Sequence, residues 1–220
     1  LKPVTVQRFG SGHDELSGEG YKSAAEIRRM ISSGRDIASV LPESAHNVYR
    51  REEKLGRGPV IPESLESAII SRLRMLPDEA YAGLPDTGEG LHNRIARAAK
   101  EECTLDAILA AGKSKRYALS RIRRIIMCAA LGISAQMSAE TPPYARVLAA
   151  NSRGCSLLRD MGEKSRIPVI TKPAEVKSCG DECRGLFELG SAAHDLYVLG
   201  YAARGERKGG ADWRTSPKIM

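Results

Sequence analysis

The chain has 220 residues, a formal net charge of +7 and aromatic side chains at only 5% of its positions, with a sequence pI near 9.3. The length allows one large domain or two small ones, and the basic balance favours a polyanionic partner. No apolar run approaches the ~18 residues of a membrane span, so no membrane partner is expected, and the scarcity of rings disfavours a protein that reads single-stranded bases by stacking.

The chain opens with an alternating segment in which Val4 and Val6 stand between polar neighbours. This alternation predicts a short strand. A strand so close to Leu1, with no initiator Met, leads us to expect further sequence upstream. Glycine-bearing loops are predicted at residues 10–14 and 17–20.

The helix predicted at residues 24–32 begins after Ser23, and Glu26 follows three residues later, which is the pattern of a capping box. A hydroxyl and free backbone N–H groups at a helix N-terminus can bind an anion. Arg28, one turn into the helix, could add a bidentate contact to that anion. The alternative is an ordinary capped helix with a surface arginine.

The region from residue 36 to residue 131 is predicted to be helical, with glycines between the helices. We expect a turn or short helix at 36–40, a helix from 42 through 49 and beyond, a linker at 56–59, and helices at 64–76, 78–82, 90–102, 105–111 and 118–131.

Positive charge is concentrated at the end of this region. Residues 91–131 carry nine Lys and Arg against three acids, which is +6 of the chain's +7. The nine cations are Arg94, Arg97, Lys100, Lys113, Lys115, Arg116, Arg121, Arg123 and Arg124. The helix at 118–131 also carries an apolar stripe of Leu119, Ile122, Ile125, Ile126 and Ala129, which would hold it on the core. Such cations are expected where a protein contacts a phosphate backbone, and the alternative is a solvated basic surface.

The pattern changes after residue 143. Strands are predicted at 144–150 and 167–171, with a helix at 152–162 between them, which makes a small parallel, right-handed βαβ unit. A helix is predicted at 181–201, and 208–220 form a glycine- and tryptophan-bearing tail.

The five cysteines are odd in number and scattered, which favours a reduced, cytoplasmic compartment. Cys103 and Cys128 are predicted to be small buried residues. The C-x₃-C spacing of Cys179 and Cys183 has no second pair of ligands, so we predict no metal site. Other chemistry-bearing residues of the C-terminal part are interpreted as structural: Asp195 and Asp212 as solitary acids, Trp213 as a packing anchor, and His194 as lacking neighbours at metal-ligand spacing.

Several segments, taken in order, resemble one family. Ser23-Ala-Ala-Glu-Ile-Arg28 resembles the S-x-x-x-I-R signature of HIGH-type nucleotidyltransferases. The segments that follow are Glu89–Arg94, Lys113–Tyr117, Arg121–Arg124, Leu131–Ile133, Pro142–Tyr144, Arg146–Leu148, Pro168–Lys172, Ala193–Tyr197, Lys208–Trp213 and Thr215–Pro217. Together they resemble the bacterial tRNA(Met) cytidine acetate ligase family over nearly all of the chain.

This resemblance implies an ATP-dependent ligase that activates acetate as acetyl-adenylate and acetylates the wobble cytidine of elongator tRNA(Met). It implies ATP, with Mg²⁺, at Ser23, Arg28 and Arg29. It implies tRNA contacts at Lys113, Lys115, Arg116, Arg121, Arg124 and Arg94. The family holds ATP with an H-x-G-H motif in its N-terminal half, and no H-x-G-H occurs in this sequence. We therefore expect the C-terminal portion of such an enzyme, without activity on its own.

The fold expected from these observations is mixed α and β. Residues 1–45 would end a Rossmann-like nucleotide-binding domain, 46–140 would form a helical tRNA-binding segment, and 141–220 a small α/β domain. Two alternatives remain at this point: a tRNA-binding module without its own activity, and a related nucleotidyltransferase with another acceptor.

Overall fold

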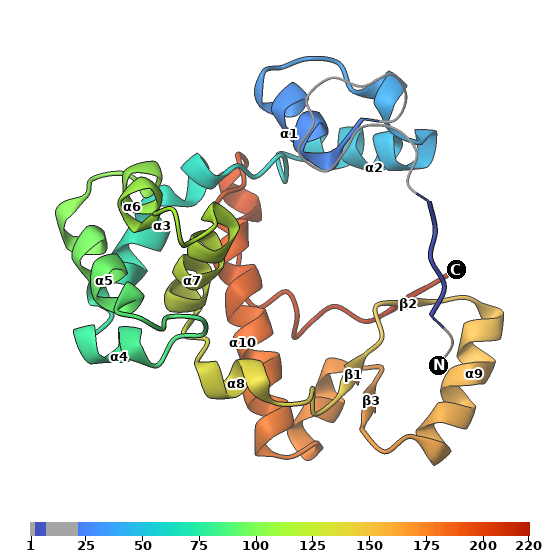
Figure 1. Cartoon of the computed structure of the whole chain (residues 1–220). Coiled ribbons are helices and arrows are strands. Elements are labelled where there is room, and N and C mark those ends of the chain that lie inside the picture. The colour runs from blue at the N-terminus through green and yellow to red at the C-terminus, as the bar shows by residue number, and fades with distance from the viewer. Residues whose placement is uncertain (1–2, 8–21) are drawn as a thin grey trace. The chain divides into compact units, whose positions relative to one another are not determined.

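A computed structural model describes residues 3–7 and 22–220 (Figure 1). The chain divides into two compact units, one of residues 1–61 with 201–206 and the other of residues 62–200 with 207–220. The predicted boundary after residue 45 falls inside a helix, α2 (Glu43–Lys54). The division into residues 1–45, 46–140 and 141–220 stays a prediction.

The first unit is helical in its described part. Its elements are α1 (Ala24–Ser32), the short 3-10 turn η1 (Ala38–Val40), α2, and a second 3-10 turn, η3 (Arg204–Glu206). The strand predicted at Val4 and Val6 is wrong. These side chains are 84% and 90% exposed and their backbone joins no strand within residues 3–7 and 22–220, so the alternation has no buried face to support it. The loops predicted at 10–14 and 17–20 lie outside the described residues.

Gly56 joins the two chain segments of this unit. Its carbonyl accepts a hydrogen bond of 3.1 Å from the N–H of Ala203. Its φ is +68°, and a Cβ at this position would lie 2.6 Å from the Cβ of Ala203, so only glycine fits without displacement. Next to it, Arg57 Nε lies 2.9 Å from Glu206 Oε2.

The second unit begins with a bundle of helices that matches the predicted order closely. They are α3 (Pro62–Met75), α4 (Asp78–Ala82), α5 (Leu91–Glu101), α6 (Leu105–Gly112), α7 (Leu119–Leu131) and the unpredicted short α8 (Ala135–Ala139). The predicted apolar stripe of α7 is confirmed, because Ile122, Ile125, Ile126 and Ala129 are at most 2% exposed. Tyr81 is also buried here and donates to the Leu73 carbonyl at 2.7 Å; burial, with a smaller effect of Asp78, raises the pKa of its hydroxyl to about 12.

The α/β part of this unit contains two small parallel sheets. Its elements are β1 (Ala145–Arg146), β2 (Ala149–Ala150), α9 (Ser152–Lys164), β3 (Val169–Ile170), the 3-10 segment η2 (Pro173–Ser178), α10 (Asp181–Val198) and β4 (Lys218–Ile219). β1 pairs with β3 and β2 pairs with β4, in both cases parallel. The predicted parallel β-α-β unit is thus confirmed, but its first strand divides between two sheets, and the tail supplies an unpredicted strand.

A second, smaller hydrophobic core is formed by residues of β3, η2 and α10. Ile170, Val176, Cys183 and Phe187 are at most 4% exposed, and Trp213 packs against Phe187 with its ring centroid 4.6 Å away. The prediction of Trp213 as a packing anchor is therefore confirmed.

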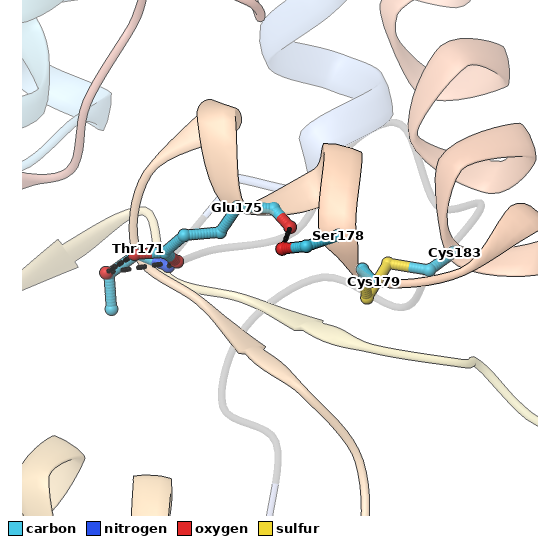
Figure 2. Close-up of a disulfide and its surroundings, with 5 residues drawn as sticks. All are labelled: Thr171, Glu175, Ser178, Cys179 and Cys183. Atoms are coloured by element: carbon cyan, nitrogen blue, oxygen red, sulfur yellow. Dashed lines mark hydrogen bonds between the residues drawn. A yellow bond between two sulfur atoms is a disulfide. The ribbon is translucent and has the colours of Figure 1, made fainter.

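One prediction about the cysteines is wrong, and one disulfide was not predicted. Cys103 is exposed, because it lies in the turn after α5 rather than on a buried helix face, whereas Cys128 is buried as predicted. Cys179 and Cys183 are not thiols but form a disulfide (Figure 2). The end of η2 and the first turn of α10 bring their Cα atoms to 5.7 Å, within the usual range for such a bond.

No helix within residues 3–7 and 22–220 has both the length and the apolar character needed to cross a membrane.

Candidate nucleic-acid interface

Two helices of the second unit carry the basic region and fix its position. On α5, Leu91, Ile95 and Ala99 are at most 1% exposed, so its cations face outward. α6 packs closely on α7, because a Cβ on Gly112 would lie 2.8 Å from the Ile122 side chain. The segment between α6 and α7 therefore begins and ends at helices that are packed against each other, and this packing fixes the positions of both its ends.

Arg94 ties α5 to this segment. Its Nε donates to the Ala111 carbonyl at 2.6 Å and its Nη2 to the Lys113 carbonyl at 3.1 Å. These carbonyls lie at the C-terminal end of α6, where a helix lacks internal partners and attracts cations. Arg94 thus closes the end of α6 while its remaining N–H groups stay available.

Tyr117 ties the same segment to the loop before α5. Its hydroxyl donates to Glu89 Oε2 at 3.2 Å, and the residue is 9% exposed. Arg116 Nη1 lies 3.8 Å from the same carboxylate, with both side chains largely in solvent. Such an exposed pair contributes little to stability and can be rearranged by a ligand.

These contacts surround an open pocket of about 400 Å³ at the N-terminus of α5. It is lined by Glu89, Gly90, Leu91, Arg94, Ser114, Lys115, Arg116 and Tyr117. Gly90 precedes the helix, with a φ of +78°, and has no side chain that could cap it. The first N–H groups of α5 therefore receive no hydrogen bond from a side chain at position 90. Three cations against one acid, together with a helix N-terminus, make a site suited to a phosphate group.

Arg121 and Arg124 of α7 bind the loop that carries Glu89 and a second acid, Asp86. Asp86 accepts two hydrogen bonds at its carbonyl, from Arg121 Nε at 3.1 Å and Arg121 Nη2 at 2.7 Å, and its carboxylate pairs with Arg124. Arg121 also lies over the Tyr117 ring, 4.9 Å from its centroid. Asp86 and Glu89 both have φ of +59°, so the loop takes a conformation that needs such outside support.

The structure therefore separates the six predicted tRNA-binding cations by their partners. Arg94, Arg121 and Arg124 bind backbone or carboxylate groups of the second unit, and Arg116 makes a loose pair. Lys113 and Lys115 are exposed, and their ammonium groups have no partner in the part of the chain that the structure describes. The prediction that all six of these residues contact tRNA stays a prediction.

The three predicted ATP-binding residues lie in the first unit. Ser23 caps α1 as predicted: it is 2% exposed and its Oγ accepts from the Glu26 N–H at 3.2 Å. The Glu26 carboxylate lies 2.9 Å from Lys22 Nζ, so the side chain that was predicted to complete the capping box makes an ion pair. Arg28 and Arg29 lie at the surface of α1. Their contact with ATP stays a prediction.

One polar cluster was missed by sequence reasoning. The carboxylate of Asp212 binds Arg146 on one oxygen and His194 Nδ1 on the other, the latter at 2.9 Å. Arg146 also lies over the Phe187 ring, 4.8 Å from its centroid. The partners are 66 and 18 residues from Asp212, so no local spacing pointed to them. The cluster ties the C-terminal segment to β1 and α10.

Metal binding is not indicated by the described residues, among which no three His, Cys, Asp or Glu side chains converge in a way that could hold an ion.

Comparison with known proteins places these features in a family context. The family model described as HIGH Nucleotidyl Transferase matches residues 1–212. The tRNA(Met) cytidine acetate ligase of Acetivibrio thermocellus is 30% identical over 231 residues, which cover 99% of this chain and 56% of that protein. The tRNA(Met) cytidine acetate ligase of Thermoanaerobacter sp. is 33% identical over 208 residues, which cover 91% and 51%.

Two solved structures are similar in fold. The apo form I crystal structure of Thermotoga maritima TmcAL matches with a TM-score of 0.89 at 23% identity, over 98% of this chain and 55% of that one. The crystal structure of the same enzyme bound with alpha-thio ATP matches with a TM-score of 0.84 at 23% identity, over 91% and 52%. The mixed α and β nucleotidyltransferase-like fold is therefore confirmed. The chain spans about half the length of the curated relatives it matches.

Proposed function

Because the chain belongs to the HIGH Nucleotidyl Transferase family, we propose that it is part of an ATP-dependent ligase that modifies tRNA. The ligase would activate acetate as acetyl-adenylate and transfer the acetyl group to the exocyclic amine of the wobble cytidine in elongator tRNA(Met). The names of relatives about 30% identical to nearly the whole chain support this reaction. A tRNA substrate also implies the cytoplasm as its location.

The observation that carries the proposal is the pocket at the start of α5. Segments 89–94 and 113–117, separated in sequence, meet there and bring Arg94, Lys115 and Arg116 around one helix N-terminus. Counting Glu89, the lining carries a net charge of +2, which suits a phosphodiester rather than a neutral ligand.

In this proposal the six cations have two roles. Lys113, Lys115 and Arg116 bind phosphates directly, because their charged groups either lack a partner among the described residues or have only a loose one. Arg94, Arg121 and Arg124 hold the loops that present them. Contacts to phosphates set the position of the tRNA, while the scarcity of aromatic side chains leaves little for base stacking.

The ATP site would use Ser23, Arg28 and Arg29. A guanidinium binds phosphate oxygens with charge-assisted hydrogen bonds, which stabilise the charge that develops when acetate attacks the α-phosphate. The described residues offer no cluster of metal ligands. Mg²⁺ would therefore arrive bound to the phosphates of ATP and neutralise part of their charge, as is usual for this ion.

Isotope-labelled acetate, ATP and an elongator tRNA(Met) transcript test the proposal, with the protein in its natural full length. We expect label on the wobble cytidine and equal release of pyrophosphate. Binding of the transcript without either product would indicate a tRNA-binding module. Pyrophosphate release with another acceptor, and none with acetate, would indicate a related nucleotidyltransferase.

A further inference from the structure

The Cys179–Cys183 disulfide lies at the junction of η2 and α10 (Figure 2). Cys179 directly follows η2, and Cys183 is the third residue of α10. The bond spans only four positions of the sequence. A loop this short removes little entropy from the unfolded chain, so the bond is poorly placed to serve as a stabilising cross-link.

The two sulfurs have different environments. Cys183 is 2% exposed and belongs to the small core, whereas Cys179 is only half-buried at its edge. A thiol from solution can therefore reach the sulfur of Cys179 more easily than that of Cys183. The residue before α10 is Gly180, which has no side chain to cap the helix. The N–H groups of the first turn, in which Cys183 lies, therefore receive no hydrogen bond from a side chain at that position. A thiolate is stabilised at such a helix N-terminus.

We propose that Cys179 and Cys183 form a redox-active disulfide that exchanges with a cellular dithiol. The proposal rests on the proposed function, because a tRNA-modifying enzyme works in a reducing compartment. Disulfides in such compartments are usually transient and serve catalysis or redox sensing.

The exchange follows the asymmetry of the two sulfurs. A thiolate of the dithiol attacks Cys179 Sγ, the disulfide breaks, and Cys183 leaves as a thiolate. The second thiol of the dithiol, after losing its proton, attacks the mixed disulfide and releases Cys179. The dithiol is oxidised to a disulfide, and the protein gains two electrons and two protons.

Reduction should loosen one end of η2 and leave the other in place. The start of η2 is held by Glu175, whose Oε2 accepts from the N–H groups of Thr171 at 2.8 Å and Lys172 at 3.1 Å. The end of η2 is held by the disulfide and by a hydrogen bond of 3.0 Å from the Ser178 hydroxyl to the Glu175 carbonyl (Figure 2). The redox state would thus control the connection between η2 and α10, next to the core that contains Phe187.

Peptide-level alkylation of the whole 220-residue chain tests this proposal. After incubation in glutathione buffers, free thiols are blocked with N-ethylmaleimide and the chain is digested with trypsin. Cleavage after Lys177 and Arg184 places both cysteines in one peptide, residues 178–184, separate from the three free cysteines. At the redox potential of the glutathione pool in a bacterial cytoplasm, we expect two N-ethylmaleimide labels on this peptide. After the chain is returned to oxidised glutathione, we expect none. Amide hydrogen exchange in this peptide should rise at least several-fold on reduction, while α7 is unchanged.

Single variants separate the two sulfurs. In Cys183→Ser, the accessible Cys179 should form a mixed disulfide with glutathione at least tenfold faster than Cys183 does in Cys179→Ser. Circular dichroism shows whether each variant is folded, and the native chain gives the redox result independently of them. A bond that stays oxidised at the cytoplasmic poise, or that does not re-form, overturns the proposal. Neither assay uses ATP or tRNA, so a failure of the redox proposal and a failure of the ligase proposal can be told apart.

Discussion

The Tyr117 hydroxyl donates a 3.2 Å hydrogen bond to the Glu89 carboxylate and so joins two segments that are 28 residues apart. This contact forms one side of the basic pocket. It also engages the Glu89 carboxylate, from which Arg116 Nη1 lies 3.8 Å away. The geometry of the pocket therefore depends on a neutral side chain as well as on its cations.

Tyr117→Phe should destabilise the chain by about 1 kcal/mol, because the Glu89 carboxylate loses a donor in a partly buried position. Urea unfolding followed by circular dichroism measures this. The ring remains, so its contact with Arg121 is kept and the fold should be intact. A variant as stable as the wild type would mean that the hydrogen bond makes no net contribution.

The double variant Lys115→Ala/Arg116→Ala should weaken tRNA binding and flatten its salt dependence. Each lost phosphate contact changes the log–log slope by about 0.7 to 0.9, so we expect a change of about one to two. Filter binding at several salt concentrations gives both quantities. The matched control is Arg153→Ala/Arg159→Ala on α9, which removes the same charge from exposed positions away from the pocket. Equal effects of the two double variants would show that only net charge matters.

Arg121→Gln should instead lower stability, by about 1–2 kcal/mol, because it removes both donors to the Asp86 carbonyl and the contact with the Tyr117 ring. We expect an unchanged salt slope for tRNA binding, since Arg121 is engaged by its own chain. Unfolding and filter binding are measured on the same sample. A flatter slope with full stability would identify Arg121 as a direct phosphate contact.

In the protein at its natural full length, Arg28→Ala should reduce the affinity for ATP about ten- to hundred-fold. The loss of a charge-assisted hydrogen bond to a phosphate costs about 1.5–3 kcal/mol. Lys54→Ala is a suitable control, because Lys54 is an exposed cation of the same unit at the end of α2. Isothermal titration gives the dissociation constants. If the two variants bind ATP equally well, Arg28 is a surface residue.

Glu175→Gln should lower stability near neutral pH and make it less sensitive to acid. Burial by itself would raise the pKa of the Glu175 carboxyl, but the N–H groups of Thr171 and Lys172, with the Thr171 hydroxyl, outweigh this and lower the pKa. A lowered folded-state pKa stabilises the fold above the unfolded value, about 4.3, and this contribution is lost as pH falls through the folded value.

The stability difference between the wild-type chain and the Glu175→Gln variant should therefore be roughly 1 kcal/mol at pH 7, after allowance for solvent screening, and shrink below about pH 4. Urea unfolding at pH 7 and at several acidic values measures it. A difference that is constant with pH would show that the ionised form is not preferred in the folded state.

Sequence reasoning located most helices because their signals are local. The stripe from Ile122 to Ala129 lies within one helix, and its 3.6-residue period is visible without any partner. The parallel pairing of β1 and β3 followed in the same way from a strand, a helix and a strand in short succession.

The tertiary structure decided what those elements do with their polar groups. Arg94 and Lys115 are both cations in the sequence, but Arg94 closes the end of α6 while Lys115 faces solvent. The partners of Arg121 and Asp212 lie 35 and 18 or more residues away, and a hydrogen bond over such a separation depends on packing rather than on spacing. The same holds for β4, whose residues Lys218 and Ile219 become a strand only because β2 offers them an edge.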